Sequence, residues 1–246
     1  MKNALNALAD LYGIDGCKAG WFVAKQCART GEISTRVIAC FEDLIDWDHD
    51  HAVVAVDIPI GLSSDGMRAC DNHARKLLGR PRASSVFSPP TRAALATSTY
   101  EEACEINHAA SGKRISIQAF HIRKKIREVD DLLHAHAGAR TRVFEVHPEL
   151  SFMHLRMQEG GPAHGLRESK AHASGFALRH AMLVRCFGSA VDAALAARKP
   201  AQASQDDVLD AFAVLWSARR IASGEAHRIP DAIETDAASI PMAIHC

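Results

Sequence analysis

The chain has 246 residues, of which 48% are hydrophobic and 24% are charged, a composition that predicts a globular protein and excludes wholesale disorder. Lysine plus arginine and aspartate plus glutamate each number 29, and the resulting formal net charge of zero argues against a general nucleic-acid binder. No apolar run approaches the roughly 20 residues that a membrane-spanning helix needs.

Cysteine and histidine usage argues against a disulfide framework and against a metal site built from these two residue types. The seven cysteines are widely spread with no Cys-x-x-Cys pair, and the 14 histidines form no His-Glu-x-x-His motif. The start, Met1 to Leu5, has one positive charge but no sustained apolar stretch behind it, so no signal peptide is predicted. We therefore expect a soluble, cytoplasmic protein with no membrane segment. Its oligomeric state is left open.

The N-terminal part of the chain predicts strands. Each candidate is a short apolar or alternating run bounded by turn residues, and the fourth is unbroken apolar, as expected of a strand buried on both faces. The predicted strands are 11–15, 21–25, 33–40 and 52–56, with a short helix over 41–47.

Residues 61–116 lack a clean period and are interrupted by glycines and prolines, so we expect an insertion within one domain that spans residues 1–246. Beyond it the pattern predicts a long helix, a fifth strand and two more helices, the last opening on a sequence similar to a capping box. The ranges are a helix at 70–78 inside the insertion, a helix at 117–137, a strand at 142–146 and helices at 170–187 and 204–223.

The order of these elements indicates the fold. Three consecutive strands with short links favour an antiparallel meander, and the later alternation of strands and helices favours parallel additions to the same sheet. This arrangement resembles the ribonuclease H-like fold. The expectation is an α/β protein with a mixed five-stranded sheet flanked by helices and an insertion after the fourth strand.

Carboxylates at strand ends and at one helix start are the candidate catalytic residues. Asp15 and Asp57 end the first and fourth predicted strands, and Glu145 lies within the apolar fifth. Asp207 and Asp210 are three residues apart and share one face of the last helix. An open acidic cluster suits Mg²⁺ or Mn²⁺, and we expect the four aspartates to be its ligands. Two such ions about 4 Å apart can activate water and stabilise the leaving oxygen of a phosphodiester.

Each carboxylate also has a structural interpretation. Asp15 and Asp57 precede turn residues and could simply begin turns. Asp207 follows a potential helix cap by three residues, so capping is as well supported as metal binding. Glu145 and Asp210 are harder to explain structurally, because their surroundings are apolar and a buried charge is costly unless paired.

Five blocks of the sequence carry a family resemblance: 12–21 (YGIDGCKAGW), 56–61 (VDIPIG), 84–87 (SSVF), 144–152 (FEVHPELSF) and 206–211 (DDVLDA). They resemble the signature blocks of domain-of-unknown-function family 429, described as predicted nucleases of ribonuclease H-like fold. The resemblance implies that Asp15 and Asp57 match the first-strand and fourth-strand acids of junction resolvases and that Asp207 and Asp210 match their last acidic pair. Glu145 has no clear counterpart there. Phosphate-holding groups that the resemblance implies nearby are Arg68, Ser85, Gln118, Lys170 and Arg179.

Charge is unevenly distributed along the chain. From Arg68 to Arg127 there are twelve Lys or Arg against four Asp or Glu, a balance of +8, so the remainder carries −8. A protein that holds an anionic substrate over a metal site would show this division, and so would a solvated helix face with a charged loop.

The function expected is therefore a metal-dependent nuclease or phosphodiesterase acting on nucleic acid or another phosphate-containing substrate. One alternative is phosphoryl transfer on a small phosphorylated metabolite, because Asp15-Gly16-x-x-x-Gly20 resembles the phosphate-holding first turn of the actin and sugar-kinase superfamily. A second alternative is a non-catalytic binding protein whose acidic cluster only supports the fold.

Overall fold

A five-stranded mixed sheet forms the centre of the molecule, in the order β3-β2-β1-β4-β5. The computed structural model describes residues 9–47, 51–66 and 68–246. Met1 to Leu5, where the sequence predicts no signal peptide, lie outside the described residues. Strands β1, β2 and β3 pair antiparallel, whereas β4 joins β1 and β5 joins β4 in parallel. This confirms the predicted fold class. The strands are β1 (Asp10–Cys17), β2 (Gly20–Gln26), β3 (Ile33–Ile38), β4 (Ala52–Val56) and β5 (Val143–Glu145).

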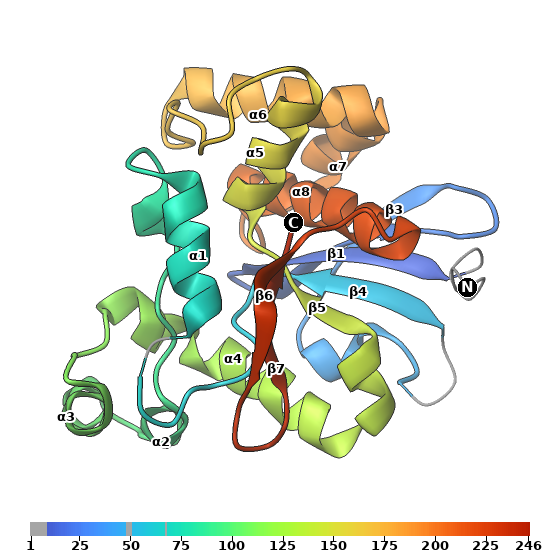
Figure 1. Cartoon of the computed structure of the whole chain (residues 1–246). Helices are drawn as coiled ribbons and strands as arrows, with labels where there is room; N and C mark the ends of the chain where they lie inside the picture. The colour runs from blue at the N-terminus through green and yellow to red at the C-terminus, as the bar shows by residue number, and fades with distance from the viewer. Residues whose placement is uncertain (1–8, 48–50, 67) are drawn as a thin grey trace.

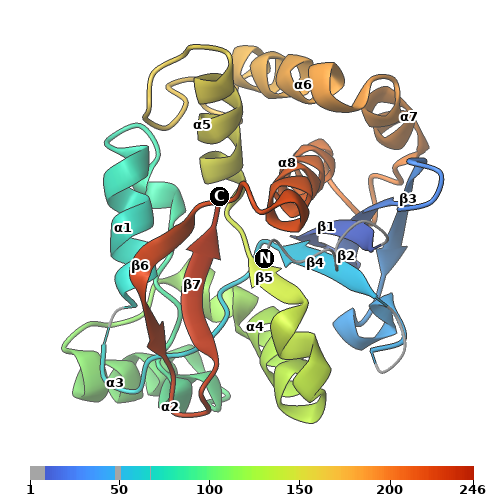
Figure 2. The same cartoon turned by 45° about the vertical axis from the view of Figure 1, so that its right-hand side comes forward.

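Helices cover both faces of this sheet (Figures 1 and 2). Helix α8 lies on one face, and α5, α6 and α7 share with it and with that face one large apolar cluster. The second cluster, on the other face, includes residues of α4 and of the short 3₁₀ helices η1 and η3. The bounds are η1 (Phe41–Leu44), α4 (Ile117–Ala135), η3 (Ala137–Thr141), α5 (Pro148–Gln158), α6 (Ala173–Phe187), α7 (Ala190–Ala197) and α8 (Gln205–Ser223).

The contact between β1 and α8 is unusually close. A Cβ atom built on Gly13 of β1 would lie 2.2 Å from the Leu215 backbone nitrogen and 2.3 Å from the Ala211 carbonyl oxygen of α8. Only glycine permits this approach, because any side chain would overlap the helix backbone. The glycine therefore fixes how near the start of α8 comes to the end of β1.

The stretch between β4 and α4, predicted as an insertion with one helix, contains more regular structure than expected. Its elements are α1 (Ala69–Leu78), η2 (Ala83–Ser85), α2 (Arg92–Leu95) and α3 (Tyr100–Ser111). Helix α1 buries an apolar face against α5 and the C-terminal strands. Helix α3 escaped prediction because its buried residues are few and small, namely Ala103, Cys104 and Asn107, and they give no clear apolar period.

A C-terminal hairpin, β6 (Arg228–Thr235) and β7 (Pro241–His245), was not predicted. Strand β6 is largely exposed and contains Pro230, so it lacks the alternation that indicates a strand. The hairpin lies beside α1 and meets the end of β5 through a bridge between Val146 and His245 (Figure 2). None of the helices in the described parts of the chain is long and apolar enough to cross a membrane.

Candidate active site

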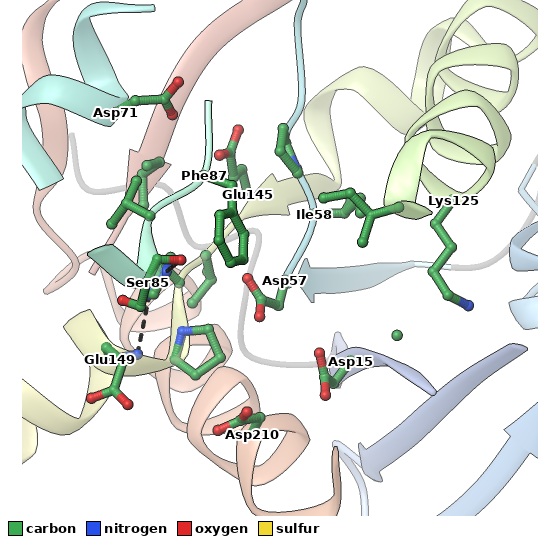
Figure 3. A pocket seen from close by; sticks show the side chains of 18 of the residues that line it. Asp15, Asp57, Ile58, Asp71, Ser85, Phe87, Lys125, Glu145, Glu149 and Asp210 are labelled. Atoms are coloured by element: carbon green, nitrogen blue, oxygen red, sulfur yellow. Dashed lines mark hydrogen bonds between the residues drawn. The ribbon is translucent and has the colours of Figure 1, made fainter. Parts of the chain in front are cut away.

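Four of the predicted carboxylates, Asp15, Asp57, Glu145 and Asp210, line one cavity of about 310 Å³. The three aspartates come from three elements: the end of β1, the residue after β4 and the first turns of α8. Figure 3 shows them lying around a common space, with Asp57 between the ring of Phe87 and Asp15. These three side chains therefore face a common space.

Sheet register explains why Asp15 and Asp57 point the same way. Ile14 pairs with Val56, and the amide of Asp57 donates to the Ile14 carbonyl at 2.9 Å, so the two aspartates form the next row across the sheet. Side chains alternate between faces along a strand, and this row points to the face that α8 covers. The close contact of α8 with Gly13 then brings Asp210 to the same place.

Burial and like charge both disfavour ionisation here. Burial raises the pKa of Asp15 well above the usual value for aspartate, and the Asp210 and Asp57 carboxylates raise it further. Burial likewise raises the pKa of Asp57 to about 6, although His147 and Lys170 oppose part of the rise. Among the described residues, neither Asp15 nor Asp57 receives a hydrogen bond on its carboxylate.

Lys170 is a cation in direct contact with the acidic cluster. Its ammonium group donates to Asp210 Oδ2 at 2.7 Å, and its side chain remains 45% exposed. Burial lowers the pKa of this lysine, but the Asp210 carboxylate and the more distant Asp15 raise it by more, so it remains charged. The segment before α6 that carries Lys170 is packed tightly, because a Cβ on Gly175 of that helix would lie 2.0 Å from the Ser169 carbonyl oxygen. The predicted substrate-binding lysine therefore does line the cavity.

A divalent cation suits this donor set. Within residues 9–47, 51–66 and 68–246, no three Asp, Glu, His or Cys side chains are close enough together to form a ready-made metal site. Mg²⁺, however, commonly takes one or two carboxylates and completes its octahedron with water and substrate oxygens. The carboxylates of Asp15 and Asp57, which lack hydrogen-bond partners among the described residues, are hard oxygen donors of that kind.

Glu145, predicted as a catalytic acid, is instead held in a buried ion pair with Arg68. The guanidinium contacts both Glu145 oxygens, at 2.7 and 2.8 Å, and Glu145 also accepts the Ile60 amide at 2.7 Å. Register gives the reason. Glu145 pairs with Val56 and so lies one row before Asp57, with its side chain on the other face of the sheet.

The same ion pair argues against the phosphate contact predicted for Arg68. The arginine is 1% exposed, and its remaining N–H groups donate to Asp71 and to the Ile60 carbonyl. All five guanidinium donors are thereby satisfied inside the protein. Arg179 is likewise held in a buried ion pair, since it binds both Glu149 oxygens at 2.7 and 2.9 Å.

Asp207 has the capping role that the sequence left open. Its carboxylate accepts the Ser204 amide at 2.7 Å, while the Ser204 hydroxyl accepts the Asp207 amide at 3.1 Å. It is not among the residues that line the cavity. Its charge nevertheless contributes to the raised pKa of Asp15. The metal-ligand role predicted for Asp207 is thus replaced by a capping box that starts α8.

Of the two remaining predicted substrate-binding residues, one lines the cavity and the other does not. Ser85 lines the cavity, with its hydroxyl donating to the Arg82 carbonyl at 2.7 Å. Gln118 is exposed in the first turn of α4 and does not line it.

The lining side chains that sequence reasoning missed include Phe87, Lys125 and His147. The Lys125 ammonium donates to the Gly20 carbonyl and lies 4.5 Å from the Trp21 ring centre. One signal in the sequence could have drawn attention to Lys125: it is three residues after the apolar Ile122, so the two side chains lie on the same side of the helix. His147 Nδ1 accepts the Glu149 amide, which leaves the proton on Nε2, 3.3 Å from the Ser85 carbonyl oxygen.

Comparison with known proteins places the chain in a family without assigning an activity. Neither the curated proteins nor the solved structures contain a significant match to this sequence. A family model does match residues 13–235, which include every carboxylate that lines the cavity. The chain therefore belongs to DUF429, a family described as proteins of unknown function.

Proposed function

We propose that this protein is a Mg²⁺- or Mn²⁺-dependent phosphodiesterase whose scissile phosphate lies beside Asp15, Asp57 and Asp210. The observation that carries the proposal is the convergence of these buried or half-buried carboxylates in one cavity, where the pKa values of Asp15 and Asp57 are raised. Close like charges without partners are costly, and a divalent cation would relieve their repulsion.

The residues in and around the cavity would have different roles in such a reaction. Asp15 and Asp57 would hold the cation, which when bound polarises the phosphate and activates water. Lys170 and Lys125 present ammonium groups that can hold phosphate oxygens. Glu145 and Arg68, joined to each other, support the loop that follows β4 through the Ile60 amide and carbonyl.

Phosphoryl transfer in the manner of the actin and sugar-kinase superfamily has less support. That alternative needs free backbone amides in the turn between β1 and β2 to hold phosphate. In this turn the Ala19 amide already donates to the Gln202 carbonyl at 3.0 Å.

The test is metal-dependent cleavage of phosphodiesters by purified protein, compared with two variants. Asp57→Asn removes a charge from the cavity, and Asp131→Asn removes one from an exposed position on α4 that does not line it. We expect cleavage with Mn²⁺ or Mg²⁺ by the wild type and by Asp131→Asn, and a loss of about 100-fold or more with Asp57→Asn. Equal cleavage by all three proteins, or none by any across duplex, single-stranded, branched and dinucleotide substrates, would refute the proposal.

A further inference from the structure

The cavity has a charged part and an apolar part. The charged part contains the acidic cluster, formed by Asp15, Asp57 and Asp210, together with Lys125 and Lys170. Much of the remaining wall is apolar and comes from Ile58, Pro59, Val86, Phe87, Ile122 and Pro148. An inorganic phosphate alone would leave that wall without a partner, so the wall indicates a ligand with an apolar portion next to its phosphate.

Phe87 is the aromatic side chain of this wall. It follows η2 on a loop, its ring lies beside Asp57 (Figure 3), and it is 40% exposed. Exposed apolar rings adjacent to a phosphate-binding group are the platforms on which unpaired bases stack, and stacking is tolerant of base identity. The cavity of about 310 Å³ lies at the lower end of the roughly 300–1,000 Å³ typical of small-molecule pockets. It is therefore suited to one nucleotide rather than to a stacked base pair.

Much of the basic segment is engaged within the protein, and its exposed cations Lys76, Arg80, Arg114 and Lys124 do not line the cavity. Beside Arg68, arginines at other positions in the segment also donate to protein acceptors: Arg75 to Val86 and Ser88, Arg82 to Pro81 and Arg167, Arg92 to Asp130 and Asp236, Arg123 to Phe120 and Ser98, and Arg127 to Leu95. Among the described residues, the cations that line the cavity outside ion-paired Arg68 are Lys125 and Lys170. Duplex binding depends on neutralising several phosphates, whereas two lysines suit one or two.

We propose that the group recognised in this cavity is a single nucleotide with an unpaired base, the base stacking on Phe87 and the phosphate lying at the acidic cluster beside Lys170. This inference rests on the proposed function and specifies its substrate class. The nucleotide can belong to a free mono- or dinucleotide or to the end of a single strand, since both present the same chemistry.

The experiment is calorimetric titration with adenosine 5′-monophosphate and with ribose 5-phosphate, in Mn²⁺, on wild type and two variants. Phe87→Ala removes the ring, and Leu77→Ala is the matched control, because Leu77 is 39% exposed on α1 and does not line the cavity. Stacking on an aromatic side chain is worth about fivefold in affinity at its lower range. We expect the wild type to bind the nucleotide at least that much more tightly than the sugar phosphate. In Phe87→Ala the affinity for the nucleotide should fall to that for ribose 5-phosphate, which should itself be unchanged. In Leu77→Ala both affinities should match those of the wild type.

Competition by a single strand and by its blunt duplex distinguishes the sources. A single strand that competes better than the mononucleotide identifies a strand end, and a strand that competes no better identifies a free nucleotide. The inference is overturned if the nucleotide binds no better than ribose 5-phosphate, if Phe87→Ala changes nothing, or if the duplex competes as well as the strand. Base-dependent binding without metal-dependent cleavage would refute the catalytic proposal alone, and cleavage without base dependence would refute this inference alone.

Discussion

At the scale of single residues, Arg68 has the largest expected effect on stability. It neutralises Glu145 and Asp71 where all three side chains are almost completely buried. Arg68→Met keeps the volume but leaves two buried carboxylates uncompensated, so the free energy of unfolding should fall by about 3–5 kcal/mol. Urea unfolding measures this, with Arg185→Met as the control, since its pair with Glu159 is exposed and worth at most about 1 kcal/mol. Equal losses in the two variants would contradict the structural role assigned to the pair.

Asp57 predicts a specific dependence of stability on pH. Its pKa rises from 3.8 in the unfolded chain to about 6 in the folded protein, mainly because of burial. The folded state therefore binds more protons between these values, and the free energy of unfolding should fall as pH rises from about 4 to about 6. In metal-free buffer Asp57→Asn should remove that part of the fall and be about 1–3 kcal/mol more stable than wild type at pH 8. Urea unfolding at pH 4, 6 and 8 tests this, and a variant no more stable than wild type at pH 8 would refute it.

At the scale of elements, the packing of α8 on β1 depends on the missing side chain of Gly13. A Cβ there would overlap the α8 backbone, so Gly13→Ala should displace the helix and lower the free energy of unfolding by at least about 1–3 kcal/mol, the usual cost of overpacking. Gly66→Ala is the control, because its Cβ would meet nothing within 4 Å. Chemical denaturation of both variants compares them, and a harmless Gly13→Ala would mean that the helix and strand are further apart than described.

At the scale of the whole molecule, the acidic cluster should couple metal binding to folding. A cation that binds only the folded state at about 100 times its dissociation constant adds about 2.7 kcal/mol. For a chain of this size that corresponds to a rise in Tm of roughly 5–10 °C. Differential scanning calorimetry with and without millimolar Mn²⁺ should show the rise in wild type and not in Asp15→Asn. A Tm that is independent of Mn²⁺ would favour a structural role for the cluster.

The sequence predicted this architecture well where strands are apolar and separated by short links, as in β1, β2 and β4. It also located Asp15, Asp57 and Asp210, because a strand end or a helix start carries its side chain to a predictable edge of the sheet. It could not assign a face to Glu145, which depends on the pairing of β5 with β4, a three-residue ladder whose register is set by long-range packing. The β6–β7 hairpin likewise lacked a local signal.

Glu145 and Asp57 lie in adjacent rows of the sheet and point to opposite faces, which limits changes of length in β5 within this family. Inserting or deleting one residue in β5 would turn the side chain of Glu145 toward α8 and strip Arg68 of its main partner, while Val146 would leave the apolar cluster it occupies. The number of residues in β5 therefore keeps the carboxylates of Glu145 and Asp57 on opposite faces of the sheet. Length changes should be tolerated at exposed Gly160 and excluded between Val143 and His147, a pattern that homologous sequences can reveal directly.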